Sequence, residues 1–226
     1  MATAITQPVD EHIREEKKTA EVLFGGVTGE VLLAAGAVVL TIIALTGRMP
    51  EILLAVGVIA LGAALVFESA AISLRIYNLL NETAKSRFGM AELGIGTTVE
   101  SITGIAAIVL GVLAIFRLHP MVLIPAAIIV IGACLILEAG ANARINALRV
   151  EKPEEHPYLE EITRQSVWAT TEIQAIVGIG GVTLGILSLC GVFPMTLNLI
   201  AVLGMSAAAF LSGTALSGRM LKIFES

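Results

Sequence analysis

Two closely similar segments, Leu23–Glu30 (LFGGVTGE) and Leu93–Glu100 (LGIGTTVE), lie 70 residues apart. Each segment is followed by a long apolar run. Both segments fit the pattern L-x-x-G-x-T-x-E, and no charged residue follows either glutamate until Arg48 and Arg117. A motif that recurs at a fixed period indicates a repeated structural unit. The long apolar run that follows each motif in the sequence indicates that this unit lies in a membrane.

The composition agrees with a membrane protein. Of the 226 residues, 56% are hydrophobic and 15% are charged, which is far more apolar than a soluble domain. Six segments approach the roughly 20 residues that a helix needs to cross a bilayer: Val27–Thr46, Ile52–Ala71, Thr97–Phe116, Met121–Leu137, Ile173–Leu189 and Met195–Leu211. Strands of a β-barrel would alternate in polarity instead. The predicted fold class is an all-α integral membrane protein with six transmembrane helices.

Three prolines mark the predicted connections on one side of the membrane. Pro50, Pro120 and Pro194 each begin the second helix of a pair, where a missing N–H is tolerated. The predicted outer turns are Gly47–Pro50, Arg117–Pro120 and Gly191–Pro194. The helices therefore form three hairpins.

The hairpins align with one another as pseudo-repeats. Aligning the first two on their prolines, at an offset of 70, also matches Glu30 with Glu100, Gly62 with Gly132 and Glu68 with Glu138. The third hairpin requires an offset of 74 and has Gln174 and Ser212 where the others have glutamates. We expect one compact membrane domain, divided into a cytoplasmic N-terminal segment (1–20), hairpins at 21–82 and 83–150, a cytoplasmic linker (151–165) and a third hairpin (166–226).

The basic residues predict the orientation of the chain. Only Arg48 and Arg117 fall on the side of the proline turns, and the other twelve Lys and Arg residues fall on the side of both termini. Cytoplasmic connections carry the excess of basic residues. Both termini are therefore predicted to be cytoplasmic.

Four glutamates are predicted to lie in one layer at the cytoplasmic edge of the hydrocarbon. Glu30 precedes Pro50 by 20 residues and Glu68 follows it by 18, which places them about 30 and 27 Å from the turn at 1.5 Å per residue. The same arithmetic applies to Glu100 and Glu138 around Pro120. The glutamates have two interpretations.

In the first interpretation the glutamates are structural, capping helices or pairing with Arg75, Arg144 or Arg219 about two helical turns further along. In the second they face the interior of the bundle, where ionisable groups are usually functional. Four converging carboxylates cannot all remain ionised without a cation, so they would bind protons or a metal ion. Oxygen ligands suit divalent ions such as Mg²⁺, Ca²⁺ or Mn²⁺. Thr28 and Thr98 are the predicted supporting residues around such a site.

Other functional classes have less support. A carboxylate-bridged di-metal oxidoreductase is the second alternative, but its usual Glu-x-x-His motif is missing, because the three histidines lie outside the spans. The same observation leaves no histidine for haem, and no glycine motif has the context of a nucleotide loop. Cys134 and Cys190 lack a C-x-x-C spacing and are interpreted as packing residues. A net charge of −5 gives no indication of nucleic-acid binding.

Glycine-rich helices joined at a proline turn recur over Val22–Ser217, with Gly36, Pro50 and Gly62 in the first hairpin and Gly111, Pro120 and Gly132 in the second. In these features the chain resembles the HdeD-like family of six-helix bacterial membrane proteins. The resemblance implies a multi-pass protein of the prokaryotic cytoplasmic (inner) membrane, associated with acid or envelope stress and without an established catalytic residue set. The repeated glutamates depart from the pattern expected of that family, so no functional residue is transferred from it.

The leading prediction is a membrane protein that binds a cation, either a metal ion or a proton, at Glu30, Glu68, Glu100 and Glu138, as a small transporter, a channel or an ion-stabilised assembly. The alternative is a structural or stress-related membrane subunit in which these glutamates only pair helices. The predicted partners are the lipid bilayer and further copies of the chain, because small-residue helix surfaces favour close association in lipid. Glu172, two residues before Gln174, is interpreted as an interfacial charge.

Overall fold

The computed structural model describes residues 28–82, 87–149 and 157–224, and the side chains of 28–70, 73, 98–140 and 172–214 within them. These residues form helices and no strand: a first helix over Thr28–Leu45, then α2 (Pro50–Glu82), α3 (Arg87–Ile115), α4 (Pro120–Arg149), α5 (Pro157–Leu189) and α6 (Pro194–Phe224). Each of the six contains a stretch of at least 18 residues that is long and apolar enough to cross a membrane. The predicted all-α, six-helix membrane fold is confirmed.

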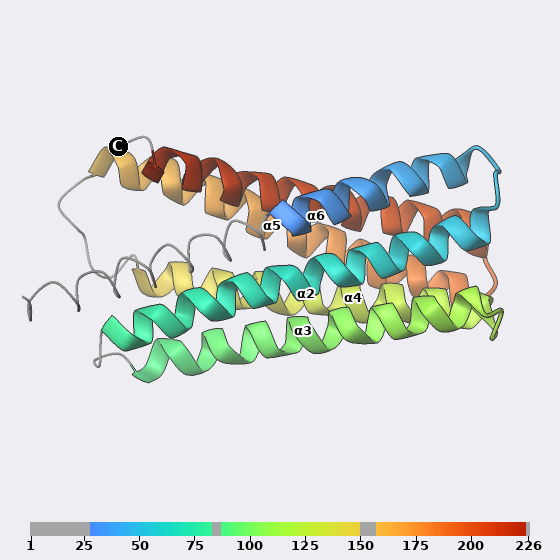
Figure 1. Ribbon diagram of the computed structural model, residues 1–226, viewed down its shortest axis with the longest axis horizontal. Coiled ribbons are helices and arrows are strands. Elements are labelled where there is room, and N and C mark those ends of the chain that lie inside the picture. The colour runs from blue at the N-terminus through green and yellow to red at the C-terminus, as the bar shows by residue number, and fades with distance from the viewer. Residues whose placement is uncertain (1–27, 83–86, 150–156, 225–226) are drawn as a thin grey trace, which may run out of the picture.

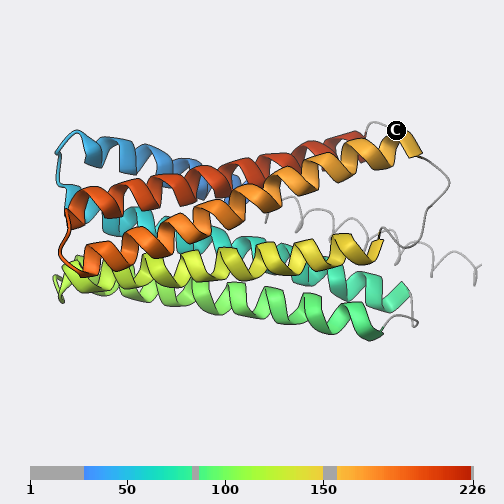
Figure 2. The ribbon, with the colours of Figure 1, turned by 180° about the vertical axis from the view of Figure 1, so that it is seen from behind.

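The helices run up and down along the long axis of the molecule, as Figures 1 and 2 show from opposite sides. The three proline turns lie together at one end, which we call the turn end. The ends of α2, α4 and α6 lie at the other end, which we call the carboxyl end because Glu30, Glu68, Glu100 and Glu138 belong to that half of their helices. Pro50, Pro120 and Pro194 begin α2, α4 and α6, as predicted. α5 begins at Pro157, inside the segment that the sequence assigns to a linker.

The three proline turns share one backbone conformation. In each turn, the residue three places before the proline and the residue directly before it have positive φ: Gly47 (84°) and Met49 (42°), Arg117 (60°) and His119 (48°), Gly191 (83°) and Phe193 (39°). Glycine adopts this left-handed conformation without steric penalty, whereas a residue with a Cβ does not. The second turn therefore places an arginine where the other two have glycine.

Among α2 to α6, the most extensive helix contacts join different hairpins. Within this set α2 packs mainly against α3, and α4 packs mainly against α5, while the hairpin pairs α3–α4 and α5–α6 share smaller interfaces. Glycines explain this preference. A Cβ on Gly104 would lie 2.5 Å from the carbonyl oxygen of Gly62, and a Cβ on Gly178 would lie 2.7 Å from that of Gly132. The backbones touch at these two points, as is typical of small residues at helix contacts in lipid.

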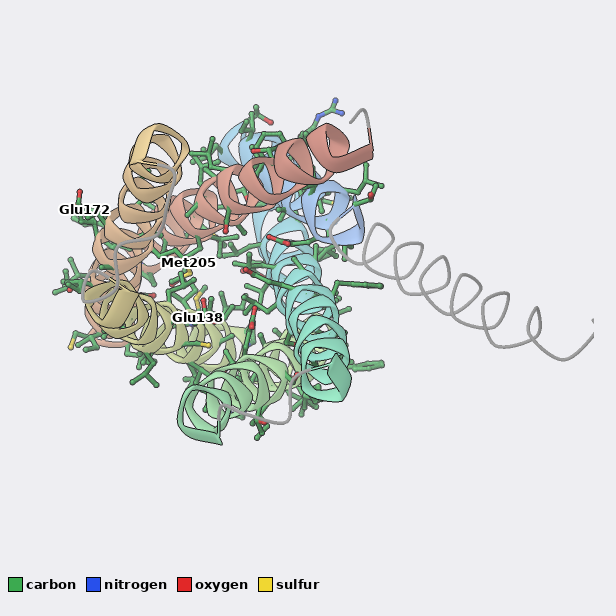
Figure 3. The ribbon with its side chains drawn as sticks, turned by 90° about the vertical axis from the view of Figure 1, so that its left-hand side faces the viewer. Glu138, Glu172 and Met205 are labelled. Carbon is green, nitrogen blue, oxygen red and sulfur yellow. The ribbon has the colours of Figure 1, made fainter. Side chains whose placement is uncertain are left out.

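The core contains sets of buried residues that the offsets of 70 and 74 align with one another. From the turn end inward, these sets are Leu54, Ile124 and Asn198; Val58, Ile128 and Val202; Leu61, Ile131 and Met205; and Leu65, Leu135 and Ala209. None of these side chains is more than 8% exposed. Seen from the carboxyl end, the helices surround an interior into which Met205 and Glu138 project (Figure 3). Large apolar side chains such as Leu32 and Ile102 are exposed on the outside, where a bilayer would cover them.

We expect Gly104→Ala to destabilise the protein by about 1–3 kcal/mol, because the added methyl group collides with the backbone of α2. Thermal unfolding of the purified protein in detergent measures the effect. Gly36→Ala is the matched control, since a Cβ on Gly36 meets no atom within 4 Å. Equal stability of the two variants would contradict the close contact between α2 and α3.

We expect Arg117→Gly to stabilise the protein by up to about 1 kcal/mol, because it relieves the left-handed conformation of a residue with a Cβ. Arg48→Gly removes the corresponding charge from the first turn at a position without positive φ. It therefore separates the loss of charge from the relief of strain. The same thermal-unfolding measurement is made on both variants. Higher stability of both Arg117→Gly and Arg48→Gly would show that the loss of charge, not the relief of the left-handed conformation, is responsible.

Candidate functional site

Two of the four predicted glutamates are almost fully buried. Glu30 on the first helix is 1% exposed and Glu100 on α3 is 3% exposed, whereas Glu68 on α2 and Glu138 on α4 are half-buried. One carboxyl oxygen of Glu30 and one of Glu100, Oε1 in both, are buried and have no hydrogen-bond partner among the side chains that the structure describes. Buried polar atoms in folded proteins nearly always have a partner. These two oxygens therefore mark a place where a partner is missing.

Glu68 and Glu100 contact each other directly. Their carboxyl groups, one on α2 and one on α3, lie within hydrogen-bonding reach of each other. Ser69 and Ser101, the next residue on each helix, form a hydrogen bond, with 2.7 Å between the hydroxyl oxygens. The two helices are thus linked by side chains at the carboxyl end and by touching backbones at Gly62 and Gly104.

Glu138 has a partner on its own helix. The thiol of Cys134, four residues earlier on α4, donates a hydrogen bond to Glu138 Oε1 at 3.1 Å. Cys134 is 2% exposed, and Thr103 of α3 is a further hydrogen-bond neighbour of its sulfur. The interpretation of Cys134 as a packing residue was therefore incomplete. Its spacing of four from Glu138, which places both side chains on one helix face, was the signal in the sequence.

Glu30 lies against α6. A Cβ on Gly213 would lie 3.0 Å from Glu30 Oε1 and 2.7 Å from a methyl group of Val31. Because Gly213 has no side chain, the carboxyl group of Glu30 has room between the first helix and α6. The carboxyl group of Glu30 lies close enough to those of Glu68 and Glu138 to interact electrostatically. The carboxyl group of Glu100 interacts in the same way with those of Glu68, Glu138 and Glu30.

The third hairpin contributes neutral residues at the positions that the alignment predicts. Gln174 is 8% exposed and Ser212 is 7% exposed. Glu172 is exposed and projects from the outer side of α5 (Figure 3), in agreement with its interpretation as an interfacial charge. The bundle interior at the carboxyl end therefore receives acids from hairpins one and two and neutral polar groups from hairpin three.

The remaining predicted residues are less closely defined. Thr28 is half-buried and Thr98 is exposed, and their supporting role stays a prediction. The side chains of Arg75, Arg144 and Arg219 lie outside the described side chains, so ion pairing with them also stays a prediction. Among the side chains that the structure describes, the basic ones are Arg48, Arg117 and His119, all in the turns at the opposite end.

The described residues contain no group of three or more His, Cys, Asp or Glu side chains arranged to hold a metal ion. What the geometry provides instead is a pair of carboxyl groups within hydrogen-bonding reach of each other, a thiol–carboxyl hydrogen bond and two unpartnered oxygens. Groups of this kind can bind and exchange protons.

Comparison of the chain with protein-family models, curated proteins and solved structures found no match. The resemblance to the HdeD-like family therefore stays a prediction.

Proposed function

We propose that this polytopic membrane protein binds protons, or a cation in their place, at the carboxyl groups of Glu30, Glu68, Glu100 and Glu138. We call these four groups the carboxyl site. The position of the Glu68 and Glu100 carboxyl groups within hydrogen-bonding reach of each other is the observation that supports the proposal. An ionised carboxylate only accepts hydrogen bonds, so a bond between two carboxyl groups requires that one of them hold a proton.

The surroundings of the carboxyl site favour a bound proton. Burial disfavours an ionised carboxylate that has no partner, and the described basic side chains, Arg48, Arg117 and His119, all lie at the turn end. The thiol of Cys134 beside Glu138 and the backbone of Gly213 beside Glu30 are neutral. A proton shared by two carboxyl groups removes one negative charge and occupies almost no volume. The association with acid stress that the HdeD-like resemblance implies would suit such a protein.

A divalent metal ion is the other cation that fits this chemistry. Oxygen donors favour Mg²⁺, Ca²⁺ or Mn²⁺, and the unpartnered oxygens of Glu30 and Glu100 are available as donors. Metal binding would require at least three of the carboxyl groups to converge on one ion, and the described residues contain no group of three arranged in this way. The proton therefore ranks first.

The proposal predicts a protonated carboxylic acid in the folded protein at pH 7. Infrared spectroscopy of purified protein separates the C=O stretch of the acid from the carboxylate bands. Exposed glutamates are ionised at this pH, so the C=O band reports buried acids alone. We expect the band in the wild type and its loss in the double variant Glu68→Gln, Glu100→Gln, which preserves side-chain shape.

Glu172→Gln serves as the matched control, because it removes an exposed glutamate and should leave the band unchanged. Elemental analysis of the same chelator-washed samples tests the metal alternative. Absence of the band together with a stoichiometric metal would replace the proton by that ion, and a redox-active metal would favour the di-metal oxidoreductase. Absence of both would sink the proposal.

A structural subunit is the second candidate function. The hydrogen bond that joins Ser69 with Ser101 favours it, because side-chain hydrogen bonds between membrane helices stabilise their association by about 0.6–2 kcal/mol each. In a purely structural role, the C=O band would persist at every pH at which the protein stays folded, whereas a site that binds and releases protons loses the band as the pH rises. A pH titration of the infrared band therefore separates the two functions.

We further propose that the three hairpins are pseudo-repeats, that the protein lies in the cytoplasmic membrane of a prokaryote with both termini in the cytoplasm, and that it forms homo-oligomers. The proposal of repeats is supported by the common turn conformation and by the two glycine contacts. The orientation is supported by the distribution of basic residues. Oligomerisation rests on the small-residue helix surfaces.

The two native cysteines test the orientation. Cys190 is exposed next to the third turn, and Cys134 is buried. We expect a membrane-impermeant maleimide added to intact cells to label Cys190, because the turn end faces outward, and to leave Cys134 unreacted until the protein is unfolded. Cys190→Ser should abolish the labelling. Labelling of Cys190 only after cell lysis would reverse the proposed orientation.

A further inference from the structure

Asn198 is a buried polar residue that the carboxyl site does not use. It lies on α6 near the turn end, is 2% exposed, and its Oδ1 is buried without a hydrogen-bond partner. The aligned residues of the other hairpins, Leu54 and Ile124, are buried and apolar. A buried amide oxygen without a partner costs about 1–3 kcal/mol. An ordered water usually provides the partner for such a group.

An apolar barrier separates Asn198 from the carboxyl site. Ser212, which aligns with Glu68 and Glu138, follows Asn198 by 14 residues on α6, or about 21 Å along the helix. The aligned sets between these levels contain no polar side chain: Val58, Ile128 and Val202; Leu61, Ile131 and Met205; Leu65, Leu135 and Ala209. Two buried hydroxyls, of Thr41 and Ser206, also lie at these depths, and they donate to carbonyl oxygens of their own helices, those of Ala37 and Val202. The region between Asn198 and the carboxyl site is thus mainly apolar.

Met205 is the most adaptable part of this barrier. Its side chain projects into the interior (Figure 3) and its Cε occupies the position that a Cβ on Gly181 would take. The aligned residues of the other hairpins, Leu61 and Ile131, are branched and stiffer. Methionine has three rotatable side-chain bonds and adapts its shape more readily than branched side chains. Movement of Met205 is therefore the simplest way to open the barrier to water.

We infer that Asn198 binds water at the turn end of the interior and that protons pass between this water and the carboxyl site when water bridges the layer of Leu61, Ile131 and Met205. This inference rests on the proposed function. A proton entering from the turn end moves along hydrogen-bonded water and binds a carboxylate, and a proton leaves that site at the carboxyl end. An apolar constriction that excludes water blocks this path in the described conformation.

Proton flux into liposomes tests the inference. The purified protein is reconstituted with a pH-sensitive dye inside, and a pH step is applied in the presence of a K⁺ carrier that prevents charging. We expect Met205→Ser to raise the initial proton flux about tenfold over the wild type, because a hydroxyl in the constriction favours water there. Leu211→Ser, on the same helix at an exposed position, should leave the flux unchanged.

Asn198 is tested in the same assay. Asn198→Leu introduces the residue found at position 54, and we expect it to return the flux of Met205→Ser to the wild-type rate, since water loses its binding group at the turn end. On its own, Asn198→Leu should raise thermal stability, because it removes a buried oxygen without a partner. Leu61→Thr places a hydroxyl in the same layer and replaces Met205→Ser if that variant does not fold.

The outcomes separate the inference from the function on which it rests. No increase in flux for a folded polar variant of the barrier would overturn the inference. The inference would also be overturned if Met205→Ser raised the K⁺ leak, measured without the carrier, as much as it raises the proton flux. The same holds if Asn198→Leu left the proton flux of Met205→Ser unchanged. If the infrared band of the protonated acid persists in these cases, the carboxyl site stands and only the pathway fails. Loss of the band from the wild type would instead remove the proposed function.

Discussion

The close approach of the Glu68 and Glu100 carboxyl groups inside the bundle sets the requirements that the surrounding residues meet. Within hydrocarbon, a polar group must find its partner inside the protein, because no water is available to replace it. Two acids can satisfy each other only by sharing a proton, and only if their helices are held close together. The touching backbones at Gly62 and Gly104 provide this proximity, and the Ser69–Ser101 hydrogen bond maintains it beside the acids.

The third hairpin gives the bundle its asymmetry. Where hairpins one and two have acids it has Gln174 and Ser212, and where they have leucine and isoleucine at the turn end it has Asn198. A fully symmetric bundle would have collected six acids at one end and only apolar side chains at the other. The neutral residues limit the repulsion among the acids, and Gly213 leaves space for Glu30. The third hairpin therefore lowers the number of acids in the interior and adds one polar side chain near the turn end.

Much of the fold follows from the sequence, because apolar length and the three turn prolines are local properties. Side-chain contacts follow less directly. Counting residues from Pro50 and Pro120 places Glu68 and Glu100 at similar depth, but their close approach depends on how α2 and α3 rotate about their axes. α4 packs more extensively against α5 than against its hairpin partner α3, and this preference depends on the contact between Gly132 and Gly178, which a single sequence does not identify. The sequence predicts a packing role for Cys134 because it lacks a C-x-x-C spacing, although its spacing of four from Glu138 indicates a contact.

The common location of the three turns bears on how the protein enters its membrane. In the proposed orientation, each hairpin crosses the bilayer turn first, as a pair of helices joined by a connection too short to allow separate insertion. The leading tips carry one arginine each in hairpins one and two and no charge in hairpin three. In this orientation, Glu30, Glu68, Glu100 and Glu138 lie in the trailing halves of their helices, towards the side of synthesis. The acids therefore enter their apolar surroundings without crossing the hydrocarbon, and biogenesis avoids most of the desolvation cost of carrying them through it.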